Sequence, residues 1–136
     1  MIPVDQTILY DPDPASLMGN CFQACVASIF ELPLDMVPHF CQEEDWYLLF
    51  TNWLEENYGL HPLLIDEGIS QSWGICYGEG FSIQSGLSDR GVLHSVVAND
   101  MKIVHDPHPS KSGIKKVKDS IFFLALDPCK SAKEEK

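Results

Sequence analysis

The segment 21–30, Cys-Phe-Gln-Ala-Cys-Val-Ala-Ser-Ile-Phe, is apolar on nearly every side and carries no charge. A helix of this kind is stable only in a protein interior, where other layers cover its faces. Small side chains, among them Ala24 and Ala27, allow a neighbouring layer to approach closely. Pro33 ends the predicted helix. The chain must therefore fold around this segment.

A second helix is predicted over 44–58, because apolar side chains recur there every three to four residues and Gly59 provides a stop. Acidic residues at its start suit the positive end of the helix dipole. After Gly59 the pattern changes to short, strand-like runs. The predicted strands cover 61–65, 73–77, 81–85, 92–98, 102–106 and 120–126. Helices followed by strands indicate an α+β fold.

The length of the chain favours one domain. Its 136 residues, 45% of them hydrophobic, can bury a core without help from a metal or a disulfide. We expect a single domain over 1–128 and a polar tail over 129–136. No internal repeat divides the chain.

Charge narrows the range of partners. The formal net charge is −11, and residues 1–89 contain no Lys or Arg. An acidic surface repels phosphate, so we expect no nucleic-acid partner. No apolar stretch approaches the roughly 18 residues of a membrane span, and the N-terminus lacks the features of a signal peptide. We therefore expect a cytoplasmic protein without a membrane partner. The acidic excess serves solubility, or it reflects a preference for basic or neutral substrates.

Cys21 is the strongest candidate nucleophile among the five cysteines. It follows Gly19-Asn20 where a loop enters the buried helix. A helix N-terminus stabilises a thiolate, and its free N–H groups can hold the oxyanion of an acyl-transfer intermediate. Cys25 lies inside the helix and is interpreted as a core thiol. A buried structural cysteine is the alternative for Cys21.

A nucleophile of this type needs a base, and the predicted hairpin 92–106 supplies His94. A three-residue loop over 99–101 would place His94 directly across from Asp106, close enough for a carboxylate to hold the imidazole. A two-residue turn would pair His94 with His105 instead and turn Asp106 to the other face. The residues alone leave both registers open.

These three residues, in the order Cys, His, Asp, resemble papain-like cysteine peptidases, nearest the small branch of double-glycine leader peptidases. The likeness rests on Gly19-Asn20-Cys21, on 93–97 around His94 and on 104–107 around Asp106. It implies a papain-like α+β fold with the helix packed on an antiparallel sheet, a Cys21-His94-Asp106 triad, a peptide or protein substrate and no cofactor.

The family also implies an oxyanion-hole Gln shortly before the nucleophile. Ala15 stands six positions before Cys21, and Gln6 is the only Gln upstream of it. We rank Gln6 first for this role. Other donors remain open, namely Gln23, Gln84 and Asn20.

The function expected from the resemblance is hydrolysis of a peptide or amide bond by Cys21. The same triad would serve a deamidase or an acyltransferase of the transglutaminase type, and a catalytically silent papain-like binding module is a third interpretation. Zinc binding is the main rival. No Cys-x-x-Cys or His-x-x-x-His pair occurs, so we expect no metal.

Overall fold

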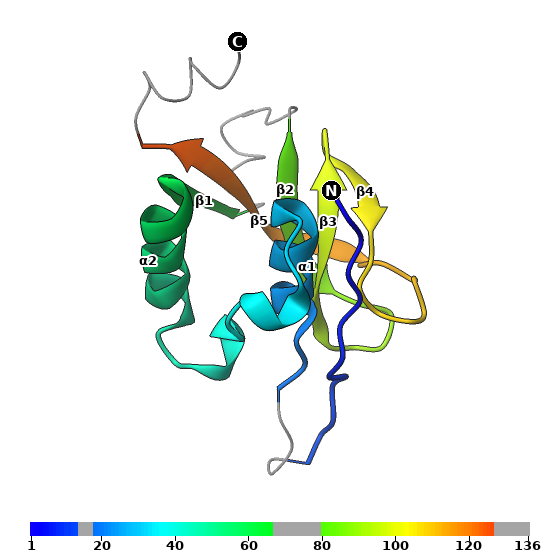
Figure 1. Cartoon of the computed structure of the whole chain (residues 1–136). Coiled ribbons are helices and arrows are strands. Elements are labelled where there is room, and N and C mark those ends of the chain that lie inside the picture. The colour runs from blue at the N-terminus through cyan, green and yellow to red at the C-terminus, as the bar shows by residue number, and fades with distance from the viewer. Residues whose placement is uncertain (14–17, 67–79, 127–136) are drawn as a thin grey trace.

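The computed structural model describes residues 1–13, 18–66 and 80–126. It contains two α-helices packed on a five-stranded antiparallel sheet (Figure 1). The helices are α1 (Cys21–Phe30) and α2 (Trp46–Tyr58), and two short 3₁₀ turns, η1 (Leu34–Met36) and η2 (Phe40–Gln42), lie between them. The strands are β1 (Leu60–Asp66), β2 (Phe81–Leu87), β3 (Leu93–Asn99), β4 (Lys102–His105) and β5 (Lys116–Ala125), in the order β1-β5-β2-β3-β4. The α+β class predicted from the sequence is confirmed.

Helix α1 is the buried centre of the fold and has the predicted bounds. Ala24, Cys25 and Ala27 are fully buried, and the helix packs mainly on β3. The small side chains therefore allow the close approach expected from the sequence. The helix ends at Glu31, which adopts a left-handed conformation with φ 57°.

Helix α2 begins two residues later than predicted. Asp45, with φ −94° and ψ 35°, is the N-cap of the helix, and Glu43 before it closes η2 in an extended conformation, with φ −105° and ψ 148°. The acidic side chains at 43–45 consequently precede the first turn. Aromatic rings join α2 to α1, with Phe22 at 5.0 Å from Phe50 and 5.4 Å from Trp46 between ring centroids.

The sheet is longer than predicted in places, because β2 continues to Leu87 and β5 begins at Lys116. At Gly86 the pairing of β2 with β5 shifts in register, and a Cβ there would lie 1.9 Å from the Lys116 carbonyl oxygen. Only glycine permits this approach. The strand predicted over 73–77 lies outside the described residues.

The β3–β4 hairpin has a two-residue loop, but its register is neither of the two that the sequence left open. Asn99 pairs with Lys102, and the turn consists of Asp100 and Met101. Both have positive φ, 51° and 67°, as a type I′ turn requires. The turn suits the twist of the two strands, although Met101 is an unusual residue at that position.

The two-residue loop alone would place Asp106 on the opposite face of the hairpin from His94, and a bulge in β4 reverses this. The pairing shifts so that Val97 lies opposite His105, which leaves one additional residue, Val104, in β4. One inserted residue exchanges the two faces of a strand. Counting onward from this pair, Asp106 returns to the face of His94, as a diagonal neighbour and not the directly opposite residue that a three-residue loop would have given.

Among the residues that the structure describes, neither helix is long and apolar enough to cross a bilayer.

Candidate active site

Cys21 is the first residue of α1, and the side chain of Asn20 fixes the loop that leads to it. The Asn20 Oδ1 accepts hydrogen bonds from the backbone N–H groups of Thr7 (3.0 Å) and Ile8 (2.8 Å). Its Nδ2 donates to Thr7 Oγ1 (3.0 Å). Because Asn20 is buried and committed to these contacts, it holds the start of the helix in place and is a poor oxyanion donor.

His94 and Asp106 form a buried pair. The Nε2 of His94 donates to Oδ1 of Asp106 at 2.6 Å, and the two side chains are 4% and 5% exposed. Asp106 also accepts hydrogen bonds from the backbone N–H groups of His108 (2.9 Å) and Gly113 (2.7 Å). Burial opposes ionisation of Asp106, but the bonds from His94 and from the two N–H groups outweigh it and lower the pKa of the carboxyl. Asp106 is therefore a fixed negative charge beside the imidazole.

The other side of the imidazole faces Cys21. Burial is the largest influence on the thiol and opposes the thiolate, but the hydrogen bond and charge of His94, with hydrogen bonds from Ser95, lower its pKa below the ordinary value. For His94 the pKa shift has the opposite sign. Burial favours its neutral form, yet the contacts with Cys21 and Asp106 raise its pKa. These opposite shifts favour a thiolate–imidazolium pair.

Two further thiols lie near Cys21, and their pKa values shift in the opposite direction. Cys25 is fully buried, and burial raises the pKa of its thiol well above the ordinary value. Burial, with the charge of Cys21, raises the pKa of Cys41 to about 12. Among the three cysteines that the structure describes, all of them free, only Cys21 has its thiolate stabilised.

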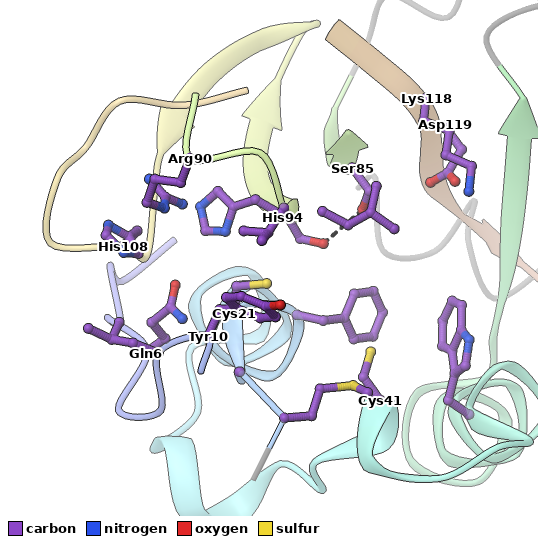
Figure 2. A pocket seen from close by; sticks show the side chains of 18 of the residues that line it. Gln6, Tyr10, Cys21, Cys41, Ser85, Arg90, His94, His108, Lys118 and Asp119 are labelled. Carbon is purple, nitrogen blue, oxygen red and sulfur yellow. Dashed lines mark hydrogen bonds between the residues drawn. The ribbon is translucent and has the colours of Figure 1, made fainter. Parts of the chain in front are cut away.

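Gln6 reaches the site from the N-terminal segment. That segment is attached to the loop after β4 and to α1, since Gln6 N–H donates to the Pro107 carbonyl (3.0 Å) and Ile2 N–H to the Ser28 carbonyl (3.1 Å). The Gln6 Nε2 donates to the Ile8 carbonyl (2.8 Å), which leaves its second N–H free for another acceptor. Gln6 lines the same pocket as Cys21 (Figure 2).

The alternative glutamines lie elsewhere. Gln23 donates to the carbonyls of Leu34 (3.1 Å) and Val37 (2.7 Å) and ties α1 to η1. Gln84 is buried in β2 and does not line the pocket. Of the four donors left open by the sequence, only Gln6 borders the pocket beside Cys21.

The pocket has a volume of about 670 Å³ and opens between α1 and the sheet (Figure 2). Arg90 and His108 lie on the side of Gln6, while Ser85 and Asp119 lie beyond Cys21 on the other side. Apolar side chains form much of the wall. They are Leu9, Tyr10, Met18, Phe22, Trp46, Val92, Leu93 and Ile121.

Sequence reasoning missed two neighbours of the site. Ser95 hydrogen-bonds the Cys21 thiol through its backbone and its side chain. The His108 ring lies edge-on to His94, with 5.9 Å between ring centroids. The position of Ser95 directly after His94 could have pointed to it. His108 lies two residues beyond Asp106, and its place beside His94 depends on the hairpin register.

In the described part of the chain, no three His, Cys, Asp or Glu side chains gather in a way that would hold a metal ion. Cys21 and His94 both line the pocket, and Asp106, which is not among the lining residues, bonds to His94. Comparisons with protein-family models, curated proteins and solved structures gave no significant match for this chain.

Proposed function

We propose that the chain is a papain-like thiol hydrolase that cleaves a peptide or amide bond with Cys21, His94 and Asp106. The observation that carries the proposal is the arrangement of the three groups. A thiol at a helix N-terminus contacts an imidazole, whose far nitrogen lies 2.6 Å from a buried carboxylate. The opposite pKa shifts of Cys21 and His94 add support, because an attacking sulfur must be ionised.

In the first chemical step the Cys21 thiolate attacks the carbonyl carbon of the substrate. The oxyanion that forms lies near the N-terminus of α1, where the backbone N–H of Cys21 and the free N–H of Gln6 are available as donors. The His94 imidazolium gives its proton to the leaving amine, and a thioester remains. Asp106 holds the imidazole in the orientation needed for this transfer.

In the second step, water attacks the thioester while His94 accepts its proton. The acid product leaves, and the Cys21 sulfur is released as a thiolate beside the reprotonated imidazole. No cofactor takes part in either step. An amine in place of water would give acyl transfer, and a side-chain amide in place of a backbone amide would give deamidation.

The compartment and the partners belong to the same proposal. Free thiols at Cys21, Cys25 and Cys41 suit the reducing cytoplasm. A net charge of −11 argues against nucleic acid, and the peptide or protein substrate follows from the proposed papain-like reaction. A papain-like fold is supported by a Cys-bearing helix on an antiparallel sheet whose β3 carries His94, with Asp106 directly after β4.

An acyl-enzyme experiment tests the proposed reaction. The protein is mixed with peptidyl p-nitrophenyl esters, and intact mass with peptide mapping locates the acyl group. We expect a transient adduct on Cys21 in the wild type and in Cys41→Ala, and none in Cys21→Ala. A competing primary amine separates hydrolysis from amine transfer by the product. Absence of an adduct and of turnover, with a folded protein, would favour the silent binding module.

A further inference from the structure

The two ends of the pocket differ in charge. Arg90 lies at the end of Gln6, where it donates to Ser110 (2.9 Å) and Ser112 (3.1 Å). Asp119 lies at the opposite end, beyond Ser85 (Figure 2). Lys118 borders the same end as Asp119, and Arg90 at the other end lies 3.6 Å from Asp89, so the two ends differ chiefly in the Asp119 carboxylate.

An apolar passage connects Cys21 to Asp119. Phe22 follows Cys21 in α1, and its ring contacts Trp46. Ile121 lies two residues from Asp119 in β5, on the same face of the strand. These three residues, Phe22, Trp46 and Ile121, form the aromatic slot of the pocket. The slot can receive the uncharged, extended part of a substrate side chain, its stem, but offers that stem no hydrogen bonds.

Among the described residues, the carboxylate at the end of the slot has no close ion-pair partner. Asp119 lies across from Ser85 in the β2–β5 pairing and across from Asp66 in the β1–β5 pairing. Within the described residues, its carboxylate makes neither a hydrogen bond nor a close ion pair. Lys118 precedes Asp119 in the strand and lines the same end of the pocket, but it is exposed and forms no close ion pair with Asp119 among the described residues. The second acidic residue that lines the pocket, Glu43, adds negative charge.

Building on the proposed function, we propose that Asp119 selects substrates with a basic side chain, Lys or Arg, beside the bond that Cys21 attacks. Such side chains combine an aliphatic stem with a cationic head. The stem matches the aromatic slot, and the head reaches the carboxylate of Asp119. An aromatic wall at Phe22 and Trp46 also attracts a passing cation.

Electrostatics support this assignment. Burial and the charge of Asp66 raise the pKa of Asp119, although Lys118 opposes them. The ionised carboxylate is thus poorly solvated, Lys118 offsets more than the repulsion from Asp66, and a bound cation relieves the remaining cost of burial. A neutral side chain of the same shape would occupy the slot without this gain.

Peptide probes that differ only in charge test the proposal. Acetyl-dipeptide vinyl sulfones carry Arg, Lys or the neutral Arg analogue citrulline at either residue, and intact mass follows their addition to Cys21. We expect the wild type to react about tenfold faster with a basic probe than with its citrulline counterpart at one of the two positions. Asp119→Asn should lose this preference and keep its rate with citrulline. Glu43→Gln, the matched control, should keep most of the preference.

Binding gives a second readout that does not depend on catalysis. Fluorescein-labelled peptide amides of the same sequences are titrated into Cys21→Ala, with and without Asp119→Asn, and followed by anisotropy. A basic preference that disappears only with Asp119→Asn supports the proposal. Equal affinity for Arg and citrulline, or a preference that Asp119→Asn leaves intact, overturns it. If Cys21 reacts with no probe and shows no selective alkylation, the proposed function fails, while the binding data still decide the role of Asp119.

Discussion

His94 Nε2 and Asp106 Oδ1 lie 2.6 Å apart in a pair that is almost wholly buried, although the two residues are not directly opposite in the hairpin. A bulge in β4 and the loop after it bring them together. The contact orients the imidazole toward Cys21 and keeps Asp106 ionised. The proposed chemistry depends on this pair.

Replacing Asp106 should affect both catalysis and stability. Asp106→Asn keeps the shape but loses the charge, so we expect kcat/KM to fall about a hundredfold or more. Asp106→Ala also leaves His94 and the N–H groups of His108 and Gly113 without their acceptor, and should lower the free energy of unfolding by about 3 kcal/mol. Steady-state kinetics and urea unfolding measure the two effects. Unchanged kinetics in a folded Asp106→Asn would show that the imidazole does not need this carboxylate.

The pKa of His94 should lie above its ordinary value of 6.5. NMR titration of the His94 ring measures this directly, and the pKa should fall in Cys21→Ala and in Asp106→Asn, because each removes a negative partner. Folding raises this pKa, so the charged ring contributes stability that is fully present below 6.5 and is lost as pH rises through the folded pKa. An identical His94 titration in all three proteins would contradict the pairing.

Gln6 should matter for turnover and not for thiol activation. Gln6→Ala removes a donor to the oxyanion, so we expect kcat to fall about a hundredfold while the rate of Cys21 alkylation stays the same. Gln23→Ala is the control. It loses the bonds to the Leu34 and Val37 carbonyls, and its free energy of unfolding should fall by about 1 kcal/mol with little change in kcat per folded molecule. A larger loss of kcat in Gln23→Ala than in Gln6→Ala would assign the oxyanion donor to Gln23.

Gly86 should tolerate no side chain. In Gly86→Ala the new Cβ would lie 1.9 Å from the Lys116 carbonyl oxygen, so the strands must separate, at a cost of about 3 kcal/mol. Because Gly86 pairs with His94, turnover should fall as well. At Gly91, where φ is +79° and the added Cβ meets no atom within 4 Å, the cost should be about 1 kcal/mol. Thermal unfolding compares Gly86→Ala with Gly91→Ala, and equal losses of stability would mean that the sheet accommodates the methyl group at Gly86.

The sequence could predict the local features of the fold and could single out Cys21, His94 and Asp106 as candidate site residues. An all-round apolar segment identified α1, and Cys21 at its start followed from the helix terminus alone. The β3–β4 register could not be read, since the Asp100-Met101 turn and the bulge at Val104 are set by strand twist and by contacts with other strands. For the same reason the position of His108 in the pocket was not predictable, and that of Asp119 depends on the pairing of β5 with β1 and β2.

Gln6 illustrates a second limit. Its place beside Cys21 depends on the attachment of the N-terminal segment to Pro107 and Ser28, contacts between residues far apart in the chain. Local pattern carries no information on such contacts. Gln6 was ranked first because the family resemblance implies a Gln before the nucleophile and Gln6 is the only Gln upstream of Cys21.

The most direct test of the account is competitive alkylation of Cys21 and Cys41 with limiting iodoacetamide at pH 6, read for each cysteine by peptide mapping. Both thiols are partly exposed in one pocket, but the pKa of Cys41 is about 12 and that of Cys21 lies below 9.0. After allowing for the weaker nucleophilicity of a more acidic thiol, Cys21 should react at least about thirtyfold faster. His94→Ala should abolish most of that advantage. Equal labelling of Cys21 and Cys41 in the folded wild type would contradict the claim that His94 and Asp106 activate Cys21.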